Sequence, residues 1–345
     1  MKKRNFSMAE YWNQKAQTHI PLLSFGRHDN TDWLSWQQKA RQKLVALLGE
    51  LPVKVPLDPE VVYSLREGDI IRERVVFDVE ENMSIPCFVL RPQSMSPNKN
   101  NPAVICCNGH PAHLGKDPVA GMRCEDEHCA AIQQMNYDYG LQMANAGYLT
   151  IIPELRGFGE RRDGVDPFPG RDACNVNFIK GALFGSYMLG LNVWDIMRVI
   201  DYLETRPEVD PKRIGMMGLS YGGTMTAFTA AVDVRIAAAD VMGYVNPWAE
   251  FAVKRANFCG IQLLPEVYKY FDTPDIAGLI APRPLLLEMG IYDDCFYIQD
   301  QLAGSQQVKA IYQAADSGDC FWKEIHAGGH CFAGHKAFDF FKKYL

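Results

Sequence analysis

One short segment, Gly218-Leu-Ser-Tyr-Gly-Gly223, constrains the fold of this chain more than any other feature. The largely apolar residues 213–217 before it are predicted to form a buried strand, and the alanine-rich residues 224–232 after it a helix. In a sharp turn between strand and helix, side chains two positions on either side of Ser220 would collide, and glycine occupies both places. G-x-S-x-G also occurs by chance in glycine-rich loops, but the flanking strand and helix favour a nucleophile elbow, which exposes a reactive serine.

Apolar strands alternate with helices along most of the chain. Short continuous apolar runs are expected for strands that are buried on both faces of a sheet. Helical segments between them predict crossovers that connect parallel strands. We therefore expect an α/β fold with a doubly wound, mostly parallel sheet and flanking helices. The predicted strands of this sheet are residues 102–107, 148–153, 213–217, 236–242, 284–289 and 321–325, and a hairpin of residues 72–79 and 85–90 precedes them.

The N-terminal residues and one internal segment differ from this pattern. Residues 1–70 are predicted to be an N-terminal helical extension packed on the main domain, because apolar positions in residues 33–48 recur with helical spacing. Residues 71–345 are predicted to form one catalytic domain. Within it, residues 247–273 are irregular and aromatic, which suits a small cap over a site.

The composition excludes several classes of partner. Hydrophobic residues make up 48% and charged residues 22% of the 345 residues, as in an ordinary soluble globular protein. A net charge of -6 argues against nucleic acid or an anionic membrane as partner. No apolar run approaches the ~18 residues that cross a bilayer, and residues 1–10 show no secretion signal. We expect a cytoplasmic protein with reduced cysteines, acting on a small molecule either alone or as a homo-oligomer.

Three residues suited to nucleophilic catalysis each follow a predicted strand. A serine hydroxyl needs a histidine base, and the histidine needs a carboxylate that orients it. Ser220, Asp293 and His330 occur in the order nucleophile, acid and base. Since the carboxyl ends of parallel strands meet at one edge of a sheet, we expect these side chains to converge into a catalytic triad.

Neighbouring histidines compete for the role of the base. His330 follows two glycines in a loop that can present the ring to the elbow. His326 lies at the end of a predicted strand, and His335 lies in the last predicted helix. We expect His330 to be the base and the other two to be surface or packing histidines.

The acid also has competitors. Asp293 and Asp294 are adjacent, and successive residues after a strand point in different directions, so at most one should face the imidazole. We expect Asp293 to be the acid and Asp294 to cap the next segment or face solvent. Asp240, which belongs with the predicted strand after the elbow, is the alternative acid in a variant triad.

Acyl transfer also requires donors for a developing oxyanion. One donor is expected to be the backbone N–H of Tyr221, directly after the nucleophile. The other should come from the loop after residue 107, where Gly109 and His110 have an N–H and Pro111 has none. We favour the N–H of His110, although the same residues also suit a simple turn.

Further candidates concern substrate and metal binding. Gly109, Arg156 and Trp248 are tentative substrate-binding residues, although a solvated ion pair also explains the arginine. Cysteines at 124 and 129 with His128 between them lack a fourth ligand, and their spacing fits no common zinc pattern. We therefore expect no metal and no cofactor.

Several motifs together resemble the α/β-hydrolase superfamily, in particular its branch of dienelactone-hydrolase-like and acetyl-xylan-esterase-like proteins. The resemblance covers roughly residues 70–345. It implies a serine carboxylesterase that acts on small acyl esters such as acetylated sugars. A peptidase or thioesterase with the same triad, and a non-catalytic binding protein of this fold, are the alternatives. The motifs that carry the resemblance are Asn108-Gly-His110, Arg156-Gly-Phe-Gly-Glu-Arg161, Gly218-Leu-Ser-Tyr-Gly-Gly223, Ala281-Pro-Arg-Pro284, Gly290-Ile-Tyr-Asp293 and Gly328-Gly-His330.

Overall fold

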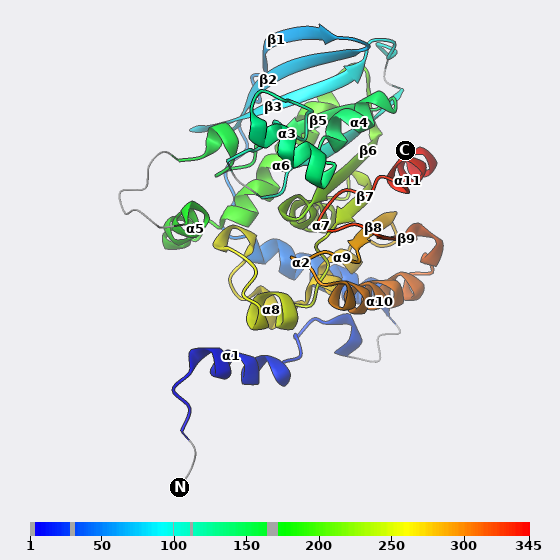
Figure 1. Ribbon diagram of the computed structural model, residues 1–345. Helices are drawn as coiled ribbons and strands as arrows, with labels where there is room; N and C mark the ends of the chain where they lie inside the picture. The colour runs from blue at the N-terminus through cyan, green and yellow to red at the C-terminus, as the bar shows by residue number, and fades with distance from the viewer. Residues whose placement is uncertain (1–3, 28–31, 99, 111–112, 164–171) are drawn as a thin grey trace.

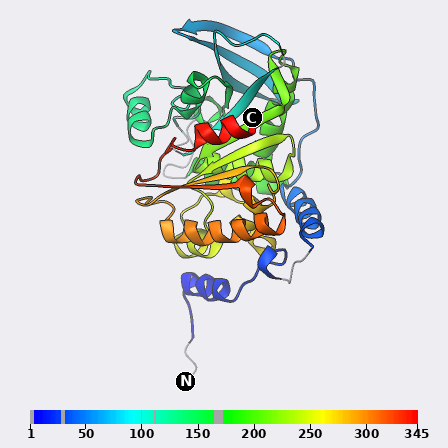
Figure 2. The ribbon, with the colours of Figure 1, turned by 90° about the vertical axis from the view of Figure 1, so that its right-hand side faces the viewer.

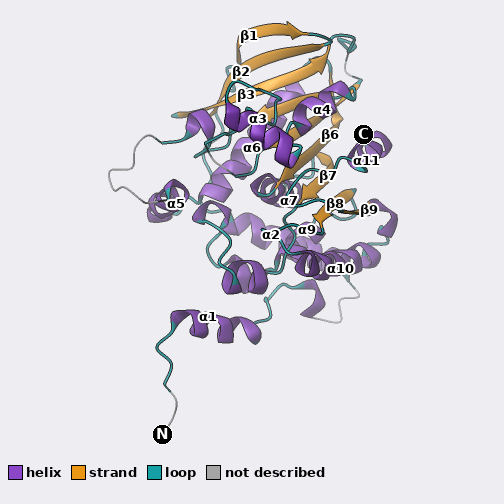
Figure 3. Cartoon of the chain, in the orientation of Figure 1, coloured by secondary structure: helices purple, strands orange, loops and turns teal. Residues whose placement is uncertain are grey.

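A nine-stranded sheet runs through the molecule and carries helices on both faces (Figures 1 and 3). The computed structural model describes residues 4–27, 32–98, 100–110, 113–163 and 172–345. The strand order is β1-β2-β3-β5-β4-β6-β7-β8-β9. From β5 to β9 all neighbours are parallel, which confirms the doubly wound, mostly parallel sheet.

The parallel strands arise from the continuous apolar runs of the sequence. Helices cover both faces of the sheet at these strands, so the side chains that point to either face are buried. In β4, Ile105 and Cys107 belong to the core on one face, whereas Val104 and Cys106 belong to the core on the other. The parallel strands are β4 (Asn101–Cys107), β5 (Leu149–Pro153), β6 (Val209–Leu219), β7 (Ile236–Met242), β8 (Leu285–Gly290) and β9 (Phe321–His326).

An antiparallel edge extends this sheet: β1 (Glu60–Glu67), β2 (Ile70–Glu80) and β3 (Met83–Pro92). The strand β1 corrects the expectation that residues 1–70 are helical. Only α1 (Met8–Gln17), α2 (Trp33–Leu47) and the short turn η1 (Phe25–Arg27) are helical there. The prolines at 52, 56 and 59 end the helical region, and the chain then pairs with β2.

Helices form one layer on each side of the sheet. The larger core packs against α2, α6 (Met188–Thr205), α7 (Tyr221–Val232), α9 (Thr273–Gly278) and α10 (Ile298–Ala314). The second core packs against α3 (Asp126–Met135), α4 (Tyr139–Asn145) and α11 (Ala337–Tyr344). Figure 2 shows α10 and α11 on opposite sides of the C-terminal strands. No described helix combines the length and apolar character that a bilayer crossing requires.

The remaining elements gather beyond the carboxyl ends of the parallel strands. They are η2 (Gly159–Arg161), α5 (Ala173–Leu183), the π-helical turn η3 (Ala249–Lys254), η4 (Gly260–Gln262) and α8 (Val267–Tyr270), while η5 (Gly318–Cys320) precedes β9. The N-terminal segment lies along this region: the N–H groups of Leu22 and Leu23 donate to the carbonyls of Lys269 and Tyr270. Figure 1 shows α1 below α8, away from the sheet.

Candidate active site

Ser220 lies in a strained turn between β6 and α7. Its torsion angles are φ 62° and ψ -115°, which a non-glycine residue adopts only where its surroundings enforce it. Its N–H donates to the carbonyl oxygen of Met242, at the end of β7, over 2.9 Å. The turn therefore holds this serine, partly exposed, at the carboxyl edge of the sheet.

Two glycines permit this turn because three backbones approach one another. A Cβ atom on Gly222 would lie 2.1 Å from the carbonyl oxygen of Cys107 in β4. One on Gly218 would lie 2.5 Å from the backbone of Gly222. Neither distance accommodates a side chain, so the turn requires glycine at both positions.

Asp293 and His330 meet at the same edge of the sheet. Asp293 Oδ2 lies 2.9 Å from His330 Nδ1. The other carboxylate oxygen, Oδ1, accepts N–H bonds from Cys295 and Phe296 over 2.9 and 2.8 Å. The carboxylate is buried and held in one orientation. This geometry favours the imidazole tautomer with its proton on Nδ1, which leaves Nε2 able to accept one.

His330 lies beside the elbow. A Cβ atom on Gly243 would lie 3.1 Å from the His330 ring, and Gly243 directly follows Met242, the acceptor for the Ser220 N–H. His330 Nε2 is buried without a hydrogen-bond partner among the described residues. No hydrogen bond joins the Ser220 hydroxyl to this ring in the described structure, and catalytic hydrogen bonds often form only when substrate binds.

The competing acids lie in other environments. Asp294 is exposed. Asp240 is fully buried in β7, and burial, followed by the neighbouring Glu288, raises its pKa well above the ordinary value. A carboxyl group that stays protonated in the interior cannot provide the charge that an imidazolium needs. Of these aspartates, only Asp293 is hydrogen-bonded to His330 in the described structure.

The competing histidines also have other contacts. His335 Nδ1 lies 2.7 Å from Glu324 Oε1. His326 is buried at the end of β9, and its burial lowers the pKa of its imidazole. No side-chain hydrogen bond of His326 joins it to another described residue. Neither ring therefore shares the acid with His330.

The loop after β4 covers the serine. A Cβ atom on Gly109 would lie 3.0 Å from Ser220 Cβ. The Gly109 N–H donates to the Tyr137 hydroxyl over 2.5 Å, so it is not available to an oxyanion. The N–H groups of Tyr221 and His110 have no acceptor among the described residues and remain the candidate donors. Pro111, which sequence analysis excluded as a donor, lies outside the described residues.

A sequence model of the abhydrolase family matches residues 12–319. The chain belongs to this family. It has the α/β-hydrolase fold, and the elbow and the Asp293–His330 pair lie at the strand ends where that fold gathers its reactive groups.

Several known proteins are similar to this chain. A Bacillus subtilis protein named as a candidate hydrolase, YtaP, is 26% identical over 314 residues, which are 88% of this chain and 98% of that protein. A Bacteroides fragilis structure, named as a candidate acetyl xylan esterase, superimposes with a TM-score of 0.75 at 19% identity, covering 94% of this chain and 83% of its own. A glucuronoyl esterase from Teredinibacter turnerae superimposes with a TM-score of 0.67 at 18% identity, covering 96% of this chain and 90% of its own. At these identities the two structures show the fold alone.

In this abhydrolase, Arg156 belongs to a buried network of ion pairs. Its Nε and Nη2 atoms lie 2.8 and 2.7 Å from the two carboxylate oxygens of Asp195, and its Nη1 lies 2.6 Å from Glu80. Every guanidinium nitrogen therefore has a partner. Ion pairing is the alternative that the sequence also allowed for Arg156, and a role of this residue in substrate binding stays a prediction.

Trp248 stands at the far end of a row of aromatic rings that begins at His330. Phe296 stacks on His330 with ring centroids 5.5 Å apart, and Phe251 stacks on Phe296 at 4.8 Å. Trp248 packs against Phe251 at 6.0 Å and is only 2% exposed. Residues 247–273 thus reach the candidate site through Phe251. Phe296 was not among the predicted site residues, and its only signal in the sequence is its place three residues after Asp293.

The metal candidates of the sequence do not converge. Cys124 is exposed, whereas His128 is buried in α3. Within the described residues, Cys124, His128 and Cys129 form no cluster with ligand atoms close enough for one ion.

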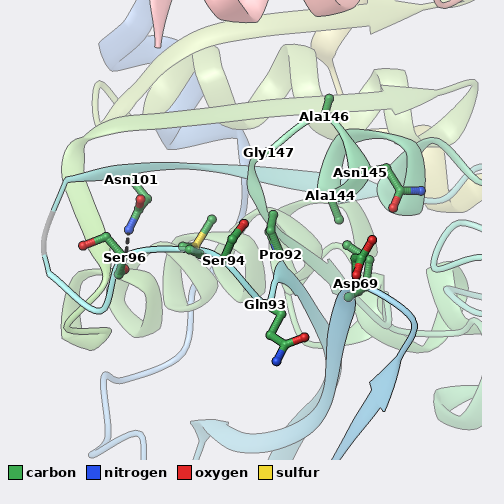
Figure 4. A pocket seen from close by; sticks show the side chains of 12 residues that line it. Asp69, Pro92, Gln93, Ser94, Ser96, Asn101, Ala144, Asn145, Ala146 and Gly147 are labelled. Atoms are coloured by element: carbon green, nitrogen blue, oxygen red, sulfur yellow. Dashed lines mark hydrogen bonds between the residues drawn. The ribbon is translucent and has the colours of Figure 1, made fainter.

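A groove of about 750 Å³ lies at the opposite edge of the sheet (Figure 4). Its walls come from the β1–β2 turn, the end of β3, the start of β4 and the end of α4. It therefore lies at the amino ends of the parallel strands, whereas Ser220, Asp293 and His330 lie beyond their carboxyl ends. Asp69, Gln93 and Asn145 are among the side chains that line it.

Proposed function

We propose that the protein is a serine carboxylesterase in which Ser220, His330 and Asp293 form the catalytic triad. The observation that supports this most is the 2.9 Å bond between Asp293 Oδ2 and His330 Nδ1. His330 Nε2 has no hydrogen-bond partner among the described residues, and Ser220 is held, partly exposed, in a strained turn at the same edge of the sheet. A buried acid, an oriented base and a presented nucleophile are the parts that acyl transfer requires.

The proposed reaction has two steps. Ser220 Oγ attacks the ester carbonyl carbon while His330 Nε2 takes the hydroxyl proton, and the negative charge on the carbonyl oxygen is stabilised by the N–H groups of Tyr221 and His110. The tetrahedral intermediate then collapses, the alkoxy group leaves with the proton from His330, and the acyl group stays on Ser220. Water, activated by His330, releases the acid and restores the serine. Asp293 orients the ring and stabilises its charged form throughout.

We further propose a short acyl group on a small or sugar alcohol. Structural neighbours named as acetyl xylan esterases support this proposal, since an acetyl group is a short acyl group esterified to a sugar hydroxyl. The row of rings from Phe296 to Trp248 packs against the His330 ring, which favours a small acyl group over a long one.

A substrate panel tests both proposals. The purified protein is assayed with p-nitrophenyl esters from acetate to octanoate and with aminoacyl-p-nitroanilides, and a fluorophosphonate probe reports whether Ser220 reacts. We expect labelling of Ser220, the highest kcat/KM for acetate, and no cleavage of anilides. Faster cleavage of anilides would indicate a peptidase instead. Steadily rising kcat/KM toward octanoate would contradict only the short acyl pocket, and absence of labelling would indicate a binding protein.

A further inference from the structure

Three ligand-type side chains converge beside the loop after β4. His110 comes from that loop, Cys174 from the first turn of α5, and Cys259 from the residue before η4. Cys259 Sγ lies 3.5 Å and Cys174 Sγ 3.9 Å from His110 Nε2, and the three ligand atoms lie within 4.8 Å of one another. The proposed hydrolysis uses only the backbone N–H of His110, so it does not explain these three side chains.

The two nitrogen–sulfur separations match those of zinc ligands. With Zn–S bonds of about 2.3 Å and Zn–N bonds of about 2.0–2.1 Å, tetrahedral geometry places nitrogen and sulfur about 3.6 Å apart. The observed separations of 3.5 and 3.9 Å fit this value. A disulfide between the two cysteines would not require an imidazole nitrogen directed at both sulfurs.

The surrounding structure holds the three side chains in place. The His110 ring packs against Phe158 and Tyr221, with centroids 5.3 and 5.5 Å away. The segment of Cys259 is fixed on α5, because the Gly260 N–H donates to Asn175 Oδ1 over 2.7 Å. The site is therefore organised by contacts that do not involve the sulfur atoms.

We propose that His110, Cys174 and Cys259 form a three-ligand site for a thiophilic divalent cation, with Zn²⁺ as the expected ion and water in the fourth position. Soft thiolates with one imidazole are a ligand set that favours zinc over magnesium or calcium. The ion would join the loop after β4, α5 and the cap-like segment 247–273, which are far apart in sequence but contribute ligand atoms within 4.8 Å of one another. It would thereby fix the loop that carries the His110 N–H.

Cobalt substitution tests this site. The reduced full-length protein is freed of metal with a chelator and titrated with Co²⁺, whose thiolate complexes show a charge-transfer absorption band. We expect one equivalent to bind with this band, and one equivalent of Zn²⁺ to displace it. Cys174→Ser and Cys259→Ser should each weaken Co²⁺ binding about 100-fold or more, since even outer partners of a metal ligand contribute 10–100-fold. Cys124→Ser removes an exposed cysteine outside the cluster and should bind as the wild type does.

Three results would overturn the proposal. One is Co²⁺ binding by the wild-type protein without a thiolate band, and another is no binding at all. The third is a native protein without metal in which thiol titration shows Cys174 and Cys259 joined as a disulfide. Circular dichroism of each variant shows whether weaker Co²⁺ binding reflects the missing ligand or a lost fold. If a variant does not fold, the absorption spectrum of the Co²⁺-loaded wild-type protein alone decides whether the site exists. None of these readouts depends on esterase activity.

Discussion

Asp293 receives two backbone N–H bonds on one carboxylate oxygen and faces His330 Nδ1 with the other. The two residues lie on separate loops, after β8 and after β9, and these strands are direct neighbours in the sheet. The pairing of β8 with β9 therefore sets the distance between acid and base. The neighbouring Asp294, one position along, is exposed instead.

Replacing the nucleophile should abolish turnover while keeping the fold. Ser220→Ala retains the Cβ atom, so the strained turn changes little. We expect kcat for p-nitrophenyl acetate to fall on the order of 10⁶-fold. Circular dichroism should be unchanged. Activity within tenfold of the wild type would show that Ser220 is not the nucleophile.

Replacing His330, the proposed base, should abolish turnover, whereas replacing the neighbouring histidines should not. His330→Ala removes the group that faces Asp293, and we expect a loss on the order of 10⁶-fold in kcat. His326→Ala and His335→Ala are the matched controls, since neither ring is hydrogen-bonded to Asp293 in the described structure, and they should retain near-normal turnover. An inactive His326→Ala with an active His330→Ala would reverse the assignment.

The acid should contribute less than the nucleophile or the base. Asp293→Ala leaves the imidazole without orientation, and a loss of about 10⁴-fold in kcat is expected by analogy with comparable triads. Asp294→Ala, one residue away and exposed, should remain near the wild-type value. A pair of variants that both retain activity would exclude Asp293 as the acid.

Adding even a methyl group at an elbow glycine should lower the stability of the fold. In Gly222→Ala the new methyl group would lie 2.1 Å from a backbone oxygen, which cannot move as a side chain does. We expect a loss in the free energy of unfolding of about 3 kcal/mol, at the upper end for an overpacked site. Gly318→Ala is the control, because no atom lies within 4 Å of its added Cβ. Denaturant unfolding of both variants measures the difference, and equal stabilities would contradict the close approach of β4 and α7.

Buried carboxyl groups beneath the site should make stability depend on pH. Burial raises the pKa of Glu288 and of its neighbour Asp240 above their ordinary values, and Glu324 raises both further. The folded state therefore binds more protons than the unfolded state above pH ~4.5, so stability should fall as pH rises from there through about 8.

Glu288→Gln tests this dependence. The amide oxygen can still accept the Ala333 N–H that Glu288 Oε2 accepts, but the group no longer titrates. The free energy of unfolding of the variant should decline less steeply with pH, by up to about 1.4 kcal/mol per pH unit. Parallel pH profiles for the two proteins would show that Glu288 is not protonated in the folded state.

Local sequence determined the parts of this protein that depend on backbone geometry and on side-chain patterning. The elbow could be predicted because glycine at 218 and 222 satisfies a turn that other residues cannot adopt. The parallel sheet could be predicted because strands buried on both faces must be apolar throughout. The order of Ser220, Asp293 and His330 followed from the positions of these strands.

Tertiary structure decided which of several suitable residues meet. From the sequence, Asp293 and Asp294 were both candidates for the acid, and His330 and His326 were both candidates for the base. Only the pairing of β8 with β9 brought Asp293 and His330 into contact. The strand β1 forms because β2 offers it an edge, although the preceding residues are helical. Arg156 is occupied by Asp195, and the cysteines at 174 and 259 converge on one imidazole. Such contacts join residues far apart in the chain, so they depend on how the whole fold packs and leave no signal in any single segment.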